Sequence, residues 1–107
     1  DRRIAFTSQL AHVVSSAYIK SPTAQLQHGF SAGSYKDMTR VARLNETMWS
    51  ELFLENAGHL TDEIDGMMTH LQAFRDAVAS KDEERLLALL REGRQLKEMA
   101  DREDMEE

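Results

Sequence analysis

Two sets of residues have types and spacings that chemistry could use, and the first surrounds a helix start. Ser34 and Asp37 have the spacing of a capping box, with Asp in place of the usual Glu or Gln, and Arg40 follows one turn later. Gly33 precedes them and permits a close approach that a side chain would forbid. A helix N-terminus with a guanidinium nearby is a receptor for a carboxylate or a phosphate. The alternative is a plain helix cap, with Arg40 paired to an acid.

The second set is a polar line near the start of the chain. Ser8, His12 and Ser16 are four residues apart, so a helix would place them on one side. No Lys, Arg, Asp or Glu occurs between Arg3 and Lys20, unlike an ordinary solvent-facing helix. Small polar groups around one imidazole suit the wall of a binding site. A core histidine that is hydrogen-bonded to a neighbour is the alternative, and both interpretations stay open at this point.

The elements that must position these residues are all predicted to be helices. Apolar residues at helical spacing predict a first helix over residues 1–19, and Pro22 breaks it. Residues 20–33 are expected to form a connector with a helical turn at 23–27. The second helix is predicted from Ser34 to about Leu44.

Three more helices are expected downstream. Asn45 should cap a helix that carries Trp49 as a core anchor and that ends with a glycine in Asn56-Ala57-Gly58. Thr61 should cap a longer helix, and Ser80 with Glu83 should form the capping box of the last one.

The last two helices carry apolar seams of the coiled-coil type. The spacing alternates between three and four residues in both. Such seams predict a helical hairpin whose exposed ridge can serve a second subunit. The seam residues are Leu60, Ile64, Met67, Leu71, Phe74 and Val78, then Leu86, Leu89, Gly93, Leu96 and Ala100. With no alternating strand pattern in the sequence, the predicted fold class is all-α with about five helices.

Composition narrows the function classes. The 107 residues suit one domain, and 41% hydrophobic with 30% charged residues exclude a disordered chain and a membrane protein. A net charge of −6, concentrated near the C-terminus, argues against nucleic-acid binding. No Cys occurs and the four His are scattered, so no metal site is expected. The chain does not begin with Met, so we expect a piece of a longer protein, and the absence of Cys is compatible with the cytoplasmic location that we expect.

Three stretches together resemble the prephenate dehydrogenase family. Thr7-Ser8-Gln9-Leu10-Ala11-His12 is similar to its Ser-His-x-Pro-His segment. Residues 33–42 resemble its Gly-x-x-(aromatic)-x-Asp-x-Thr-Arg-x-Ala segment, and residues 48–56 resemble its Met-Trp…Asn stretch. Their order and spacing agree over most of the chain.

The resemblance implies a helical dimerisation domain of the 6-phosphogluconate-dehydrogenase C-terminal-like type. Residues 1–107 would be the single C-terminal helical domain of a two-domain enzyme that forms a homodimer. That enzyme converts prephenate to 4-hydroxyphenylpyruvate by oxidative decarboxylation, on the route to tyrosine. NAD or NADP would be bound by the absent N-terminal domain, which also holds the catalytic histidine. No catalytic residue is therefore expected in this fragment, which should be inactive alone.

The resemblance also implies roles for individual residues. Arg40 matches the arginine that binds a substrate carboxylate, and His12 matches a histidine that hydrogen-bonds the substrate. Four further positions match residues at or near the pocket, namely Ser8, Gly33, Asp37 and Trp49. Gln9 departs from the family's first histidine. Ala11 departs from its proline, which predicts a straighter first helix.

Other functions remain open from the sequence. Arogenate dehydrogenase differs from prephenate dehydrogenase in its substrate, and the fragment does not separate the two. A purely structural dimerisation module would need no pocket at all. A helical enzyme like chorismate mutase would also bind a dicarboxylate, but it needs several converging cations, and Arg40 has few obvious companions in the sequence.

Overall fold

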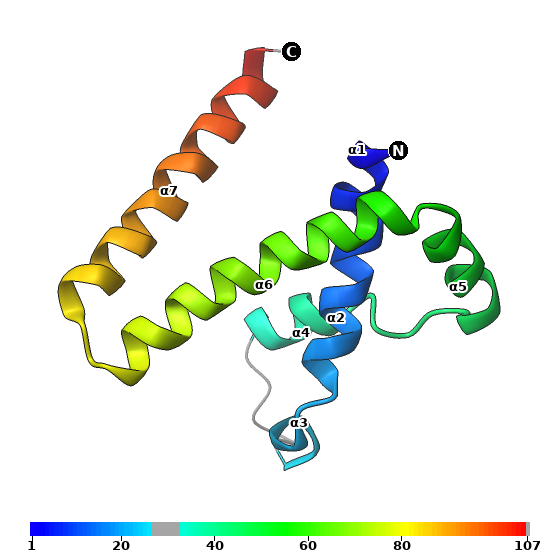
Figure 1. Cartoon of the computed structure of the whole chain (residues 1–107), viewed down its shortest axis with the longest axis horizontal. Coiled ribbons are helices and arrows are strands. Elements are labelled where there is room, and N and C mark those ends of the chain that lie inside the picture. The colour runs from blue at the N-terminus through cyan, green and yellow to red at the C-terminus, as the bar shows by residue number, and fades with distance from the viewer. Residues whose placement is uncertain (27–32, 107) are drawn as a thin grey trace. The chain divides into compact units, whose positions relative to one another are not determined.

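The computed structural model describes residues 1–26 and 33–106, and the regular structure in these ranges is entirely helical (Figure 1). This confirms the predicted fold class. The chain divides into two compact units, Asp1–Asp65 and Gly66–Glu107. The glycine-rich loop before Gly33 and His28 lie outside the described residues. No helix within the described ranges is both long and apolar enough to cross a membrane.

The first helix is continuous but changes its winding. It begins with α1 (Arg2–Ile4), passes through a π-helical segment η1 (Ala5–Leu10) and continues as α2 (Ala11–Ile19). This confirms the predicted helix over residues 1–19. The π segment was not predicted; such segments are rare and are frequent at functional sites. The winding is α-helical from Ala11 onward, so the irregular π segment lies entirely before this residue.

The connector and the second predicted helix differ in part from expectation. Pro22 begins the short helix α3 (Pro22–Leu26), and α4 (Gly33–Thr39) ends five residues before the predicted Leu44. Thr39 Oγ1 donates to the Tyr35 carbonyl (2.9 Å), and the Ala42 N–H donates to the Thr39 carbonyl (2.9 Å), which turns the chain out of the helix. Because Gly33 is already helical, Ser34 is the second residue of α4 and not its N-cap.

Asn56 makes the corner between the next two helices. Asn45 caps α5 (Glu46–Glu55) as predicted, since its side chain accepts the Met48 N–H at 3.0 Å. The Asn56 N–H donates to Phe53, and the Asn56 carbonyl accepts from Leu60 at 3.0 Å, so α6 (Ala57–Ala79) begins directly after it. The predictions of a glycine end at Gly58 and of a helix start at Thr61 are therefore wrong, because both residues lie inside α6.

A lysine occupies the turn between α6 and α7 (Glu83–Glu106). Lys81 has φ 56°, and its N–H donates to the Val78 carbonyl, while the Asp82 N–H reaches back to Ala77 at 2.9 Å. This is a Schellman motif, whose left-handed position is usually glycine. Asp82 then caps α7 by accepting the Arg85 N–H at 3.0 Å. The predicted Ser80 cap is wrong, because the Ser80 hydroxyl donates to the Asp76 carbonyl instead.

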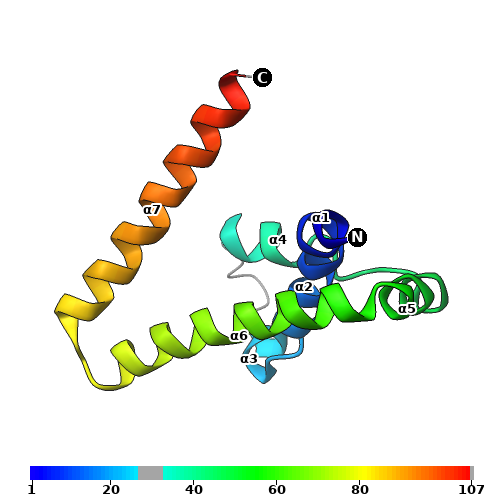
Figure 2. The ribbon, with the colours of Figure 1, turned by 45° about the horizontal axis from the view of Figure 1, so that its top comes forward.

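Each unit buries few apolar side chains. In the first unit the buried ones are Ala5, Leu10, Ala24 and Leu60, and in the second only Ala77 is buried among the described residues. Within the second unit, α6 and α7 diverge from their turn, so the expected packed hairpin does not form (Figures 1 and 2). Large apolar side chains of this unit remain half exposed or more, including Met68, Leu71, Val78, Leu87, Leu90, Leu96 and Met99.

The turn at Lys81 gives a stability prediction. A left-handed conformation costs a residue with a side chain about 1 kcal/mol relative to glycine. Lys81→Gly should therefore raise the free energy of unfolding by about 0.5–1 kcal/mol in urea denaturation. Lys81→Ala keeps the side-chain penalty and serves as the control. An equal gain from both variants would show that the backbone angle is not the cause.

Candidate functional site

His12 is held by its own helix and by α5. Its Nδ1 lies 2.8 Å from the Ser8 carbonyl, and its ring stacks on Trp49 with centroids 4.1 Å apart and planes 24° apart. A carbonyl only accepts, so Nδ1 carries the proton, and in the neutral ring Nε2 is the acceptor. Both rings are half-buried. Trp49 thus anchors the packing and fixes the imidazole at the same time.

Gln9 connects the first helix to α5 through a buried hydrogen-bond network. Only 5% of Gln9 is exposed. Its Nε2 donates to the Leu52 carbonyl (3.1 Å), and its Oε1 accepts from Asn56 Nδ2 (2.9 Å). The same Asn56 nitrogen donates to the Asp1 carbonyl (2.8 Å). Together with the contact between His12 and Trp49, these bonds hold α5 antiparallel to the first helix.

The predicted polar line is only partly covered. Ser8 and Ser16 are half-buried, like His12 between them. The fully buried serine of this helix is instead Ser15, with 2% exposure, and its hydroxyl has no hydrogen-bond partner among the described residues. The polar face of the first helix, formed by Ser8, His12 and Ser16, is therefore partly covered by the rest of the chain and partly open to solvent.

Arg40 lines a hollow at the end of α4. The hollow has a volume of about 570 Å³, and its described lining residues are Ile19, Thr39, Arg40, Ala42 and Arg43. Both arginines are exposed, and neither has an ion pair within the described part of the chain. The part of the lining that the structure describes therefore offers two cations, an apolar wall and no carboxylate.

The hollow is attached to the helix that carries His12. α4 packs against α2, where the rings of Tyr18 and Tyr35 lie 6.1 Å apart. Ile19 lines the hollow and lies seven residues after His12, hence on the same face of α2 and roughly 10 Å further along its axis. His12 itself is not among the described lining residues. The imidazole and the arginine hollow thus lie along one side of α2.

Two other predicted site residues belong to α4. Gly33 begins the helix, and a Cβ added there would meet nothing within 4 Å, so no close approach within the described structure explains this glycine. Asp37 is exposed on the same helix. Arg40 follows the last residue of α4, roughly 10 Å from Gly33 along the helix axis. The predicted receptor at the helix N-terminus is therefore wrong, because Arg40 lies at the opposite end of α4.

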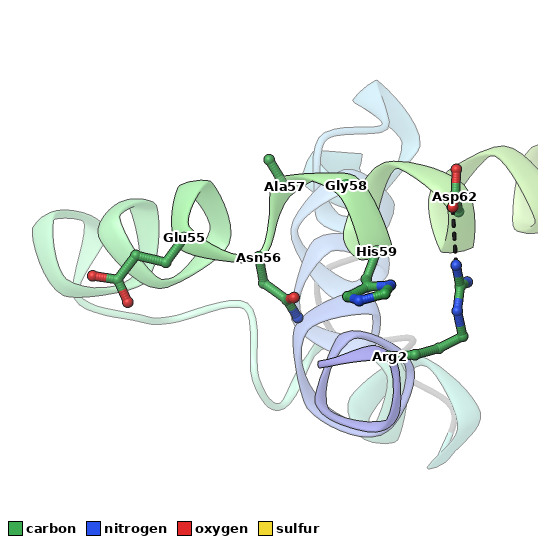
Figure 3. Close-up of a pocket in the computed structure, with 7 residues that line it drawn as sticks. All are labelled: Arg2, Glu55, Asn56, Ala57, Gly58, His59 and Asp62. Atoms are coloured by element: carbon green, nitrogen blue, oxygen red, sulfur yellow. Dashed lines mark hydrogen bonds and ion pairs between the residues drawn. The ribbon is translucent and has the colours of Figure 1, made fainter.

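A second hollow, of about 510 Å³, surrounds the start of α6 (Figure 3). It is lined by Arg2, Glu55, Asn56, Ala57, Gly58, His59 and Asp62. The Arg2 guanidinium already bonds Asp62 (2.9 Å) and Glu63 (3.0 Å), and these two hydrogen bonds raise the pKa of Arg2. Because its cation is neutralised and Glu55 adds a further negative charge, this hollow suits an organic acid less well than the Arg40 hollow.

The described residues provide no group of three or more His, Asp or Glu side chains that could hold a metal ion. The chemistry available at the Arg40 hollow is therefore charge recognition. The sequence did not point to Gln9 as the residue that holds α5 against the first helix, or to Arg43 as part of the lining of the Arg40 hollow. Arg43 carries a signal in hindsight, since it lies only three residues from Arg40.

Comparison with known proteins agrees with this helical arrangement. The family model described as "Prephenate dehydrogenase, dimerization domain" matches residues 1–92. A cyclohexadienyl dehydrogenase of Zymomonas mobilis is 35% identical over 99 residues, which cover 86% of this chain and 33% of that protein. A prephenate dehydrogenase of Bacillus subtilis is 32% identical over 57 residues, covering 53% of this chain and 15% of that protein.

The fold also has a solved counterpart. The crystal structure of Synechocystis arogenate dehydrogenase superimposes with a TM-score of 0.79, at 19% identity, over 92% of this chain and 38% of that one. At this identity the likeness concerns the fold. The chain spans about a third of the length of the Zymomonas relative.

The Gln9 network predicts a measurable loss of stability. Gln9→Met keeps the side-chain volume but removes the partner of the Leu52 carbonyl and one of the two acceptors of the Asn56 amide nitrogen, in a partly buried position. The free energy of unfolding should fall by about 1–3 kcal/mol in urea denaturation. Gln95→Met on exposed α7 is the matched control and should change it by less than about 0.5 kcal/mol. Equal effects at the two positions would contradict a structural role for the Gln9 amide.

Proposed function

Because this chain belongs to the family of prephenate dehydrogenase dimerization domains, we propose that it is the C-terminal helical part of a two-domain dehydrogenase. The complete enzyme converts prephenate to 4-hydroxyphenylpyruvate by oxidative decarboxylation, in the synthesis of tyrosine. This chain supplies the binding of the substrate carboxylates and the contacts between subunits. A cytoplasmic location remains a prediction from the sequence.

The observation that supports substrate binding is the hollow beside Arg40. Its guanidinium is exposed and has no acidic partner among the described residues, although the sequence holds 19 Asp and Glu against 13 Lys and Arg. A planar guanidinium binds a carboxylate through two parallel hydrogen bonds. Ile19 and Ala42 provide the apolar wall that a carbon ring needs. An organic acid with a ring is the ligand that matches this lining.

His12 is the second proposed substrate contact. Its Nδ1 proton is committed to the Ser8 carbonyl, which leaves Nε2 for the ligand. A neutral imidazole accepts from a hydroxyl at this nitrogen, and a protonated one donates to a carboxylate. Prephenate carries both groups, and its ring hydroxyl and ring carboxylate lie at opposite ends of the ring. Two contacts spaced along one side of α2 suit such a molecule. Ser8, Gly33, Asp37 and Trp49 are proposed to lie at or near the same ligand.

The nicotinamide cofactor is assigned to the other domain of the complete enzyme. A dinucleotide pyrophosphate is commonly held where a strand meets a glycine-rich turn and a helix N-terminus. The described part of this chain contains no strand, so its residues do not fit that role. We assign no catalytic residue to this chain, and its residues bind and orient the substrate.

Association of two chains is proposed to involve the second unit. Its half-exposed apolar side chains include the seam residues Leu71, Val78 and Leu96 and others beside the seams, and exposed patches of this kind mark protein interfaces. A Cβ at Gly66 or Gly93 would meet nothing within 4 Å, which leaves open space for another helix to approach. The family description names dimerization, and a homodimer is the simplest closed assembly.

Two alternatives follow from specific observations. Arogenate is the substrate named for the Synechocystis structure, which shares this fold. A purely structural dimerisation module would account for the apolar ridge but not for Arg40 and Arg43, which lie beside a cavity with no ion pair among the described residues.

The role of Arg40 is tested in the complete two-domain enzyme. Arg40→Ala should raise KM for prephenate by about 30-fold or more, because truncating one partner of a charge pair costs about 2 kcal/mol or more. Steady-state kinetics with NAD and with NADP would measure it. An unchanged KM would remove Arg40 from the substrate site.

The assembly is tested by sedimentation equilibrium of the 107-residue chain. The mass should be near twice 12.2 kDa at micromolar concentration. Leu90→Glu places a charge on the apolar ridge of α7 and should shift the chain toward monomer. Gln95→Glu adds the same charge on the opposite face of α7 and should leave the mass unchanged. A monomeric parent chain would overturn the homodimer.

A further inference from the structure

We infer that Arg43 is a second carboxylate-binding residue, which makes the Arg40 hollow a receptor for a dicarboxylate. The inference rests on the proposed function and adds a group that the family motif does not include. It concerns the described lining of one cavity, of about 570 Å³, formed by α2, α4 and the segment that follows α4.

Both guanidiniums are placed by local structure. Thr39 precedes Arg40 and holds the end of α4 through its bond to the Tyr35 carbonyl. The Ala42 N–H closes the following turn on the Thr39 carbonyl. Arg43 comes next and is followed by the extended backbone of Asn45, whose φ is −76° and ψ is 107°. The two arginines, three residues apart on this turn, therefore line one hollow.

The charges of the hollow are unbalanced. Two like charges beside one cavity repel each other. Here neither Arg40 nor Arg43 has an ion pair among the described residues, and the described lining includes no Asp or Glu. The Arg2 hollow in the same unit shows the contrast, since Asp62 and Glu63 bind its guanidinium. A ligand with two negative charges would balance the Arg40 hollow.

The proposed reaction supplies a ligand of this kind. Prephenate carries one carboxylate on its ring and one on its pyruvyl side chain. The ring carboxylate leaves as carbon dioxide, so the product 4-hydroxyphenylpyruvate keeps only one. If the two arginines bind one carboxylate each, the substrate uses both of them and the product uses one. The pair of arginines then favours the substrate over the product.

The experiment uses the complete enzyme and four variants. Arg43→Gln and Arg40→Gln each remove one guanidinium. Arg43→Lys keeps the charge but loses the two-pronged geometry. Lys36→Gln removes a positive charge from exposed α4, outside the described lining, and controls for net charge. For each enzyme, KM and kcat for prephenate and the inhibition constant of 4-hydroxyphenylpyruvate are measured, and thermal unfolding verifies the fold.

Both Gln variants should raise KM for prephenate by about tenfold or more, while Arg43→Lys gives an intermediate value and Lys36→Gln changes it by less than about twofold. Only one of the two Gln variants should weaken inhibition by the product. An unchanged KM in Arg43→Gln, with a raised KM in Arg40→Gln, overturns the inference and leaves the proposed function standing. An unchanged KM in both removes the proposed substrate site as well. Equal weakening of product inhibition by both variants shows that the arginines share one carboxylate, which also overturns the inference.

Discussion

The buried amide of Gln9 is the interaction on which the first unit depends. It donates to the Leu52 backbone and accepts from Asn56, so a side chain of the first helix fixes both α5 and the corner where α6 begins. A buried amide that lost these partners would carry the full cost of its desolvation. Because α5 is held in this register, Trp49 lies against His12 and fixes the imidazole. The geometry of the polar face thus depends on a side chain that touches no ligand in the proposed reaction.

Local signals explain what the sequence could predict. The Asn45 cap could be predicted because it depends only on one side chain and one N–H three residues later, and the structure confirms it. The helix over residues 1–19 was predicted from apolar spacing, and the structure confirms it. The corner at Asn56 was missed because this residue ends one helix and begins the next, so Gly58 and Thr61 offered false boundaries. Asp82 was missed because Ser80 has the same capping chemistry, and only the left-handed Lys81 decides between them.

The site was predictable in its residue types and less so in its geometry. His12 and Arg40 were singled out from spacing and family resemblance, and their binding roles remain predictions. Because α4 ends at Thr39, Arg40 lies at the opposite end of this helix from its N-terminus. It shares its hollow with Arg43, which the sequence analysis did not include. The end of α4 at Thr39 could not be predicted from the sequence, because the residues that follow Arg40, Val41 and Ala42, are both compatible with a helix. The network of Gln9 depends on contacts over more than 40 positions, which local patterns do not contain.

The π-helical segment has a consequence for insertions and deletions in this region. Each residue advances an α-helix by about 100°, and a π turn holds one residue more than an α turn. Removing a single residue between Ala5 and Leu10 would restore regular winding and keep the opening turn in nearly the same angular phase relative to His12. Arg2 would then still face Asp62, and the Asp1 carbonyl would still face Asn56. The π segment therefore absorbs one residue without changing the faces of the helix on either side, and a one-residue gap in a related chain is best placed within this segment.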